Sequence, residues 1–469
     1  MSNQFSASAL VMVSALACSS EPHPTASGSA TDNGATDNGA TGDGATEAGD
    51  TATADSTSGG DTDGPPPGCT VPYDLPGPGE TIDIPIEGRN VAVDVKPEPH
   101  GDGSWQYALF QAYGGGSFSA DASCAGVYVI AGTGGHNAPP CFGAVTFDFT
   151  TGTWAYLPNG NGFDEARTTD IDRTSETNDW PYLELTAVTT PGMPAPAHTY
   201  QLMISPPASV LGGKKGAVIR TVGAAQTMEA WDSPQSHAFD LQTGQWSRAA
   251  ENLLTDVFDG NPYTDGVATY DAANHRIWLL LGDFSSRWAV PYLDLDDATW
   301  KLSDSFESVE SSGVVRSLVV DDARGLLVVV LGSGQLWAFD RTDLAAGPVQ
   351  LEVSGTVPTQ QFRWELYPEA DGGDGSWYAF SGTGPVYEST PPYPQATEQS
   401  LHKLTPPDPD TPDGPWTVST VAISGGLTAQ YVADPSAGAF HHTRFFYVPA
   451  LQVFAWIPNG TGAVELIRP

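Results

Sequence analysis

The stretch FDFTTGTW, residues 147–154, decides the fold, because two close variants of it follow: FDLQTGQW at 239–246 and LDLDDATW at 293–300. In all three, an Asp is followed six residues later by a Trp. A strand, a short turn and a second strand that starts near the Trp form a β-hairpin, and the indole packs between neighbouring sheets. Such recurrence predicts a repeat architecture.

A second recurring feature is an apolar strand that ends in or just before glycine. It occurs six times: VYVIAG at 127–132, AVIRTVG at 217–223, IWLLLG at 277–282, LLVVVLG at 326–332, WYAFSG at 377–382 and VFAWIPNG at 453–460. With one strand before it and the hairpin after it, each unit supplies four antiparallel strands. The sequence therefore predicts an all-β fold, a β-propeller over 69–469. Six blades fit best and seven are the alternative.

These motifs carry a family resemblance. Glycines ahead of an aromatic-Asp strand, with a Trp six residues on, resemble kelch repeats of the galactose oxidase central-domain type, over roughly residues 82–469. GTGGH at 132–136, PAHTY at 196–200 and TRFFYVPALQVFAW at 443–456 resemble a group of bacterial kelch-like propellers, many of them exported. We find no counterpart of the copper-ligand tyrosines and histidines of galactose oxidase, so its chemistry is not expected, and no cofactor is predicted.

The N-terminus predicts export. Residues 1–18 contain an apolar core too short to span a bilayer, and the run Ala15–Cys18 resembles a bacterial lipobox, in which Cys18 would be lipidated. Ala at position 15 replaces the usual Leu, and no Lys or Arg precedes the core, so a cytoplasmic N-terminal helix is the alternative. Residues 19–68, rich in Gly, Ala, Thr, Ser and Asp, predict a disordered linker. We expect a protein of the bacterial cell envelope, anchored to the outer membrane or secreted.

Charge limits the partners. The chain carries 56 acidic and 18 basic residues, a net charge of −38, which repels nucleic acids and anionic lipid head groups. No nucleic-acid partner is therefore expected, and membrane attachment is expected only through the lipid anchor. We expect a monomer. No two cysteines have the spacing of metal ligands, so no metal site is predicted.

Three cysteines besides Cys18 remain for a disulfide: Cys69, Cys124 and Cys141. Exported proteins usually pair their cysteines. The short loop between Cys124 and Cys141 favours that pair, which would contribute about 3 kcal/mol in the entropic model. This leaves Cys69 as a free thiol.

Repeat phase predicts where ligands bind. Three arginines, Arg316, Arg363 and Arg444, stand five residues before the turn that ends an inner strand. Near the axis of a propeller they would share one face, and guanidinium groups bind carboxylate or sulfate in fork geometry. The alternative for each is a rim charge that pairs with nearby carboxylates.

Four further residues are candidates for the same face. His136 follows a second strand, His198 and Tyr200 begin the next unit, and Arg220 lies on the strand behind them. We expect His136 to contribute to ligand binding together with the three arginines. Two long insertions, 159–197 and 383–400, fall on this side, where binding loops usually lie.

Two functions are consistent with these residues. The first is a tethered binding propeller whose arginine-bearing face holds an anionic glycan or an envelope or extracellular protein. The second is a polysaccharide lyase for uronic-acid polymers, in which an arginine neutralises the uronate carboxylate while His or Tyr removes the C5 proton. Its catalytic candidates would be His136, His198, Tyr200 and Arg220. The lyase assignment is an analogy of residue types on a similar fold.

Overall fold

The structure is a computed structural model of the 469-residue chain. It describes residues 69–84, 115–132, 143–158, 201–221, 235–258, 266–282, 287–307, 315–358, 363–383, 398–408, 411, 414–424, 444–457 and 464–469. The chain forms two compact units, Met1–Asp61 and Thr62–Pro469, and every described residue belongs to the second. The predicted signal peptide, Cys18 and the linker 19–68 lie outside the described residues.

The second unit consists of six sheets, which we number as blades. Blade 1 contains β2 (Ser117–Ser119), β3 (Val127–Ala131), β4 (Ala144–Asp148) and β5 (Thr153–Leu157). Blade 2 contains β6 (Met203–Ile204), β7 (Ala217–Arg220), β8 (His237–Asp240) and β9 (Gln245–Arg248). Blade 3 contains β10 (Val267–Asp271), β11 (Arg276–Gly282), β12 (Arg287–Asp294) and β13 (Thr299–Glu307).

The remaining blades follow the same plan, with one strand added in blade 5 and an N-terminal outer strand in blade 6. Blade 4 contains β14 (Val315–Asp321), β15 (Leu326–Leu331), β16 (Leu336–Asp340) and β17 (Val349–Gln350). Blade 5 contains β19 (Glu365–Leu366), β20 (Trp377–Thr383), β21 (Glu398–Thr405) and β22 (Trp416–Val421), with β18 (Val353–Ser354) added in parallel to β22. Blade 6 contains β23 (Phe445–Val448), β24 (Val453–Trp456), β25 (Glu465–Arg468) and β1 (Glu80–Asp83). Short 3-10 helices are η2 (Ala208–Val210), η3 (Leu254–Asp256), η4 (Leu344–Ala346), η5 (Glu369–Asp371) and η6 (Pro449–Leu451).

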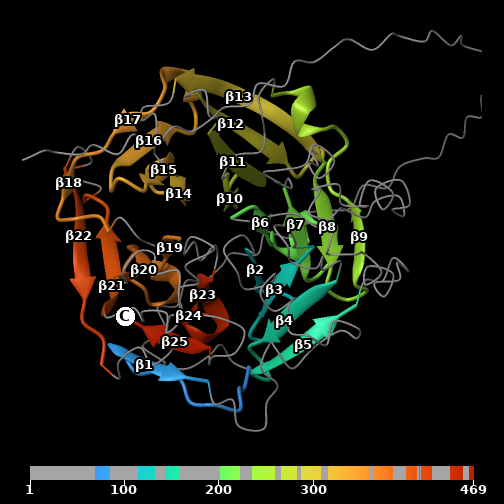
Figure 1. Cartoon of the computed structure of the whole chain (residues 1–469), viewed down its shortest axis with the longest axis vertical. Coiled ribbons are helices and arrows are strands. Elements are labelled where there is room, and N and C mark those ends of the chain that lie inside the picture. Colours follow the sequence, from blue (N-terminus) through green and yellow to red (C-terminus); the bar gives the residue numbers. More distant parts are fainter. Residues whose placement is uncertain are drawn as a thin grey trace, which may run out of the picture. The chain divides into compact units, whose positions relative to one another are not determined.

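The six sheets are arranged as a six-bladed β-propeller, as the repeats predicted. Figure 1 shows β2, β6, β10, β14, β19 and β23 nearest the centre, with the later strands of each blade towards the rim. Inner strands of neighbouring blades run side by side, and a parallel bridge joins Gln201 to Val267. One end of every inner strand therefore opens on the same side of the ring.

The repeated tryptophans pack between blades, as expected. Trp154 shares an apolar cluster with Phe446 of blade 6, and Trp246 shares one with Val129 of blade 1. Trp300 packs against residues of blade 2, where its indole Nε1–H donates to Ser236 Oγ at 2.8 Å. Each indole is at most 3% exposed. The spacing seen in the sequence thus places one large ring against the preceding blade.

The turns before these tryptophans need a left-handed residue. Gly152 and Gly244, each two positions before its Trp, have φ of 64° and 69°. The third hairpin puts Ala298 at this place, with φ of 55°. An L-residue pays about 1–2 kcal/mol in this region because Cβ approaches the carbonyl oxygen, a cost that glycine avoids.

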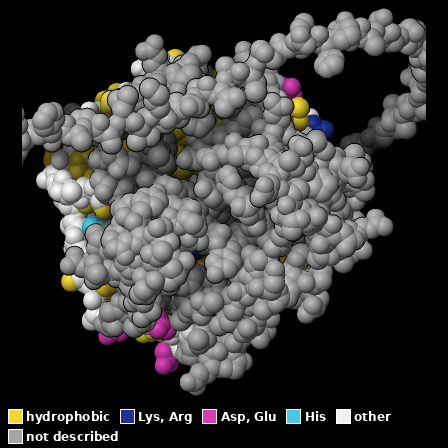
Figure 2. Space-filling view, viewed as in Figure 1, with side chains coloured by type: hydrophobic (Ala, Val, Ile, Leu, Met, Phe, Trp, Pro, Cys, Tyr) yellow, Lys and Arg dark blue, Asp and Glu magenta, His cyan; other side chains and the backbone are white. Residues whose placement is uncertain are grey.

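The N-terminal strand closes the ring. β1 pairs antiparallel with β25, in register from Glu80 opposite Arg468 to Asp83 opposite Glu465. Blade 6 therefore combines three strands from the C-terminus with an outer strand from the start of the domain. The acidic side chains at the rim near β1 are visible in Figure 2. Because the first and last strands of the propeller pair in one sheet, the ring closes without the unpaired strand edges that an open ring would leave.

The structure corrects the predicted disulfide. Cys124 is bonded to Cys69, with the two Cα atoms 5.6 Å apart, so it cannot pair with Cys141, and Cys69 is not a free thiol. Cys141 itself lies outside the described residues. The reason is ring closure: the segment before β1 crosses to blade 1, where the Tyr73 hydroxyl donates to the Phe149 carbonyl. That path brings Cys69 to the turn between β2 and β3.

Candidate functional site

The three predicted arginines stand at the starts of consecutive inner strands. Arg316 lies in β14, Arg363 shortly before β19 and Arg444 directly before β23. The backbone N–H of Trp364 donates to Ser317 Oγ at 3.2 Å, which joins the first two of these strands. The ladder of β14 shifts register between Val315 and Ser317, so Arg316 occupies a bulge. The three backbone positions thus lie at one end of blades 4, 5 and 6.

The Arg363 side chain is paired within its own blade. Its Nε lies 2.7 Å from Glu365 Oε1, and the two side chains are 16% and 20% exposed. Burial raises the pKa of Glu365 above its usual value, while the charge of Arg363 opposes that rise. Burial therefore disfavours the charged form of Glu365, the carboxylate that pairs with the Arg363 guanidinium.

Arg444 is completely buried at the junction of blades 6 and 1. Its backbone carbonyl accepts a hydrogen bond from the N–H of Ile457 at 3.0 Å. Its charge acts on Tyr128 of blade 1, whose pKa is raised by burial and lowered by Arg444, with burial the larger effect. The Tyr128 ring stacks on Phe446 at 5.0 Å between centroids. Arg444 thus stands inside the wall of the ring and has no exposed surface in this conformation.

Arg220 is also fully buried, at the end of β7. Its Nη1 donates to the carbonyl of Gly132 at 3.1 Å, and its guanidinium carbon lies 5.8 Å from the centroid of Trp246. Burial lowers the pKa of Arg220 to about 9. Gly132 is the last described residue before 133–142, the segment that contains His136. Arg220 therefore fixes the stem of that segment.

The other predicted residues of this group, His136, His198 and Tyr200, lie outside the described residues. The structure therefore does not bring them together with Arg220 or separate them from it. The same holds for Cys141 and Cys18. For Arg316 the structure describes the strand but not the side chain.

Sequence reasoning missed His237. It begins β8 and stands opposite Arg220 on one side and Arg248 on the other in the strand registers. The side chain is 6% exposed, and its pKa is lowered to about 3, first by burial and then by the Arg220 charge. Its imidazole is therefore neutral at physiological pH. The available signal was the repeat itself, since His237 stands two residues before the first residue of the FDLQTGQW motif and so belongs to the buried third strand of its blade.

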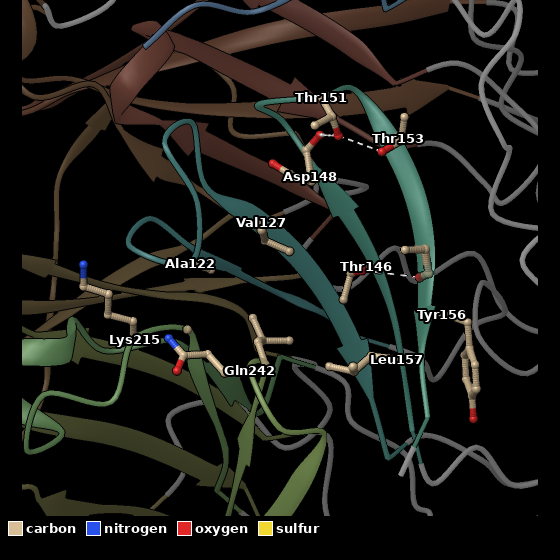
Figure 3. A pocket seen from close by; sticks show the side chains of 13 residues that line it. Ala122, Val127, Thr146, Asp148, Thr151, Thr153, Tyr156, Leu157, Lys215 and Gln242 are labelled. Atoms are coloured by element: carbon tan, nitrogen blue, oxygen red, sulfur yellow. Dashed lines mark hydrogen bonds between the residues drawn. The ribbon is translucent and has the colours of Figure 1, made fainter. Parts of the chain in front are cut away.

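A groove lies between blades 1 and 2, with a volume of about 410 Å³. One wall is formed by residues of β3, β4 and β5 and the turn between the last two, and the other by turns of blade 2 that contain Lys215 and Gln242. Figure 3 shows Lys215 and Gln242 beside one another, across from the threonines of blade 1. Sequence reasoning did not identify this groove, because it depends on how two blades diverge.

Within the described ranges, no group of three or more His, Cys, Asp or Glu side chains is placed to hold a metal ion. In the same part of the chain, no helix is long and apolar enough to cross a membrane.

Comparison with known proteins adds little evidence for the assignment of the fold. No protein-family model matches the chain, and no curated protein matches it. A solved structure of a putative 6-phosphogluconolactonase from Bacteroides uniformis ATCC 8492 is 12% identical, covers 70% of this chain and 74% of its own, and has a TM-score of 0.33. Raptor from Chaetomium thermophilum is 11% identical over 81% of this chain, with a TM-score of 0.33, and this chain spans 30% of that protein. The assignment as a β-propeller rests on the six sheets themselves.

Proposed function

We propose that this chain is an exported, lipid-anchored propeller of the kelch-like type that binds an anionic glycan at the end of the ring where the arginines stand. The observation that carries the proposal is the placement of Arg316, Arg363 and Arg444 at the starts of three consecutive inner strands. A β-propeller is suited to binding in general, because its rigid blades hold loops from several repeats around one axis. An extracellular protein partner is the competing outcome.

Export is supported by the Cys69–Cys124 disulfide. Disulfides persist in oxidising environments such as the periplasm and the extracellular space. The lipobox-like segment that ends at Cys18 would supply the anchor, and the linker 19–68 would separate the propeller from the membrane.

Recognition would centre on Arg363. A carboxylate or sulfate of the ligand would displace Glu365 from the guanidinium, because a planar fork binds either anion in two parallel hydrogen bonds. The displaced Glu365, whose pKa is raised by burial, can take up a proton more readily than an ordinary glutamate. Ligand binding would then be stronger at lower pH.

The test measures binding to uronate-bearing and sulfated polysaccharides, with a neutral polysaccharide as reference. Arg363→Ala should abolish binding, and Glu365→Gln should strengthen it by removing the competing carboxylate. Lys214→Ala, which alters an exposed lysine elsewhere on the protein, is the control and should leave binding unchanged. Equal binding by wild type, Arg363→Ala and the Arg316, Arg363 and Arg444 triple alanine variant would reject this end of the ring as the binding site.

One observation favours the lyase as a second candidate. Arg220 holds the Gly132 carbonyl at the stem of the segment with His136, next to the neutral imidazole of His237. In this reaction a base removes the C5 proton of a uronate, and an acid protonates the departing glycosidic oxygen. His136, His198 and Tyr200 supply groups of these types, and Arg220 would fix the first of them. Incubation with uronate polymers should then produce the ultraviolet absorbance of an unsaturated uronate, and its absence would exclude this candidate.

A further inference from the structure

The junction between blades 1 and 2 is hollow in its outer part, whereas the next two junctions are filled. Leu254 of η3 is buried in the cluster between blades 2 and 3, and Leu344 of η4 in the cluster between blades 3 and 4. Between blades 1 and 2, apolar packing ends at Leu157 and Leu241, which are only partly buried. Beyond these two side chains lies the groove of about 410 Å³. This volume is within the range of sites for small ligands.

Blade 1 lines the groove with hydroxyl groups. Thr146 donates from Oγ1 to the Ala155 carbonyl at 3.3 Å, and the hydroxyls of Thr151 and Thr153 lie 2.6 Å apart. A hydroxyl that donates one hydrogen bond still accepts others, so each of these groups keeps capacity for a ligand. Asp148 is different, because its Oδ1 already accepts hydrogen bonds from a serine hydroxyl and a backbone amide at 2.8 Å.

Blade 2 adds a cation and an amide. Lys215 and Gln242 line the groove and are exposed. Figure 3 shows them together, on the opposite side from Thr146 and Thr153. Lysine carries its ammonium on a flexible four-carbon stem, which lets it reach over such a groove. In a chain of net charge −38, a cation beside uncharged hydroxyls is a local exception to the prevailing charge.

We propose that this groove binds a short carboxylate-bearing saccharide. The ammonium of Lys215 would bind the carboxylate, and the hydroxyls of Thr151 and Thr153 with the Gln242 amide would exchange hydrogen bonds with the sugar hydroxyls. The apolar C–H face of the ring would rest on Leu157 and its aliphatic neighbours. The groove is distinct from the arginine-bearing end, because Thr151 and Lys215 lie in turns at the opposite ends of their blades from the starts of the inner strands.

The test uses oligosaccharides of galacturonic acid, with the neutral galactose oligosaccharides as reference, and measures binding by calorimetry. Lys215→Ala should weaken binding of the acidic probe by about tenfold, which corresponds to about 1.4 kcal/mol, because it removes the charged partner of the carboxylate. The neighbouring Lys214→Ala does not line the groove and should bind as wild type does. The double variant Thr151→Val with Thr153→Val should weaken binding of the acidic probe with its carboxylate contact intact.

Two comparisons separate this proposal from the proposed function. The triple alanine variant of Arg316, Arg363 and Arg444 should keep binding in the groove and lose it at the arginine-bearing end. The proposal is overturned if wild type binds none of the acidic probes, if the neutral probes bind equally well, or if Lys215→Ala retains full affinity. Unchanged thermal unfolding of Lys215→Ala and of the threonine double variant shows that their loss of binding is local.

Discussion

Removing the Cys69–Cys124 disulfide should lower the free energy of unfolding by about 4 kcal/mol. The bond joins residues 55 positions apart. In the entropic model a loop of this length restricts the unfolded chain by about 14 cal/mol/K, which is about 4 kcal/mol at 25 °C. The bond also holds the segment that leads into β1 against blade 1, so its loss weakens the place where the ring closes.

The assay is urea unfolding followed by tryptophan fluorescence, with and without reductant. The double variant Cys69→Ser with Cys124→Ser should unfold at lower urea than wild type and show no further response to reductant. Cys141→Ser is the matched control and should unfold as wild type does. If Cys141→Ser is destabilised as much as the double variant, or if reductant leaves wild type unchanged, the argument from ring closure is refuted.

Three further predictions concern stability. Burial lowers the pKa of His237 to about 3, so its imidazole stays neutral in the folded protein, whereas in the unfolded chain it takes up a proton below about pH 6.5. The free energy of unfolding should therefore fall by about 2 kcal/mol from pH 8 to pH 5. In urea titrations at the two pH values, His237→Gln should reduce this loss. Asp271→Asn should cost about 3 kcal/mol, because the carboxylate is buried against an arginine, whereas Asp322→Asn, on the exposed side of the same arginine, should cost less than about 1 kcal/mol by the same measurement. Ala298→Gly should raise the thermal midpoint by relieving about 1 kcal/mol of left-handed strain, and the reciprocal Gly244→Ala should lower it.

The blade pattern could be predicted because the strands that pair in each blade are close together in the sequence. The Asp-to-Trp spacing fixes a hairpin whose two strands are adjacent in sequence, as in the cross-strand pair Phe147 and Trp154. The glycine-ending strands pair with the hairpins that follow them, so each blade is encoded within one stretch of chain. Even the inner-strand arginines could be aligned in this way, because repeat phase is conserved when each blade has the same order of strands.

Contacts between distant parts of the chain could not be predicted from such local motifs. The disulfide prediction chose Cys141 because it is near Cys124 in sequence, whereas ring closure brings in Cys69 from 55 positions away. Burial of Arg220 and Arg444 likewise depends on neighbouring blades, so the sequence did not predict their environment. The groove depends on the divergence of two blades, a property that no motif encodes.

The turns that follow the inner strands connect one blade to the next. In blade 1, Asp121 accepts the backbone N–H groups of Ala208 and Gly216 of blade 2. In blade 3, Asp271 lies 2.9 Å from Nη1 of Arg341 of blade 4. Hydrogen bonds from Trp278 and Asn274, with the Arg341 charge, hold the pKa of Asp271 below its usual value against the effect of burial. These contacts have no common sequence, but they occupy one position in the repeat.

In blade 4 an arginine, Arg324, makes the corresponding contact to the next blade in place of a carboxylate. Asp321 holds its guanidinium at 3.1 Å, and the same group donates to the carbonyl of Pro407 of blade 5. Because a substitution at these turns would loosen a junction between blades, this end of the ring is constrained by stability. The opposite end, where Arg363 begins its strand, carries no such requirement from these contacts. Substitutions around Arg363 should therefore be tolerated better than substitutions in these turns.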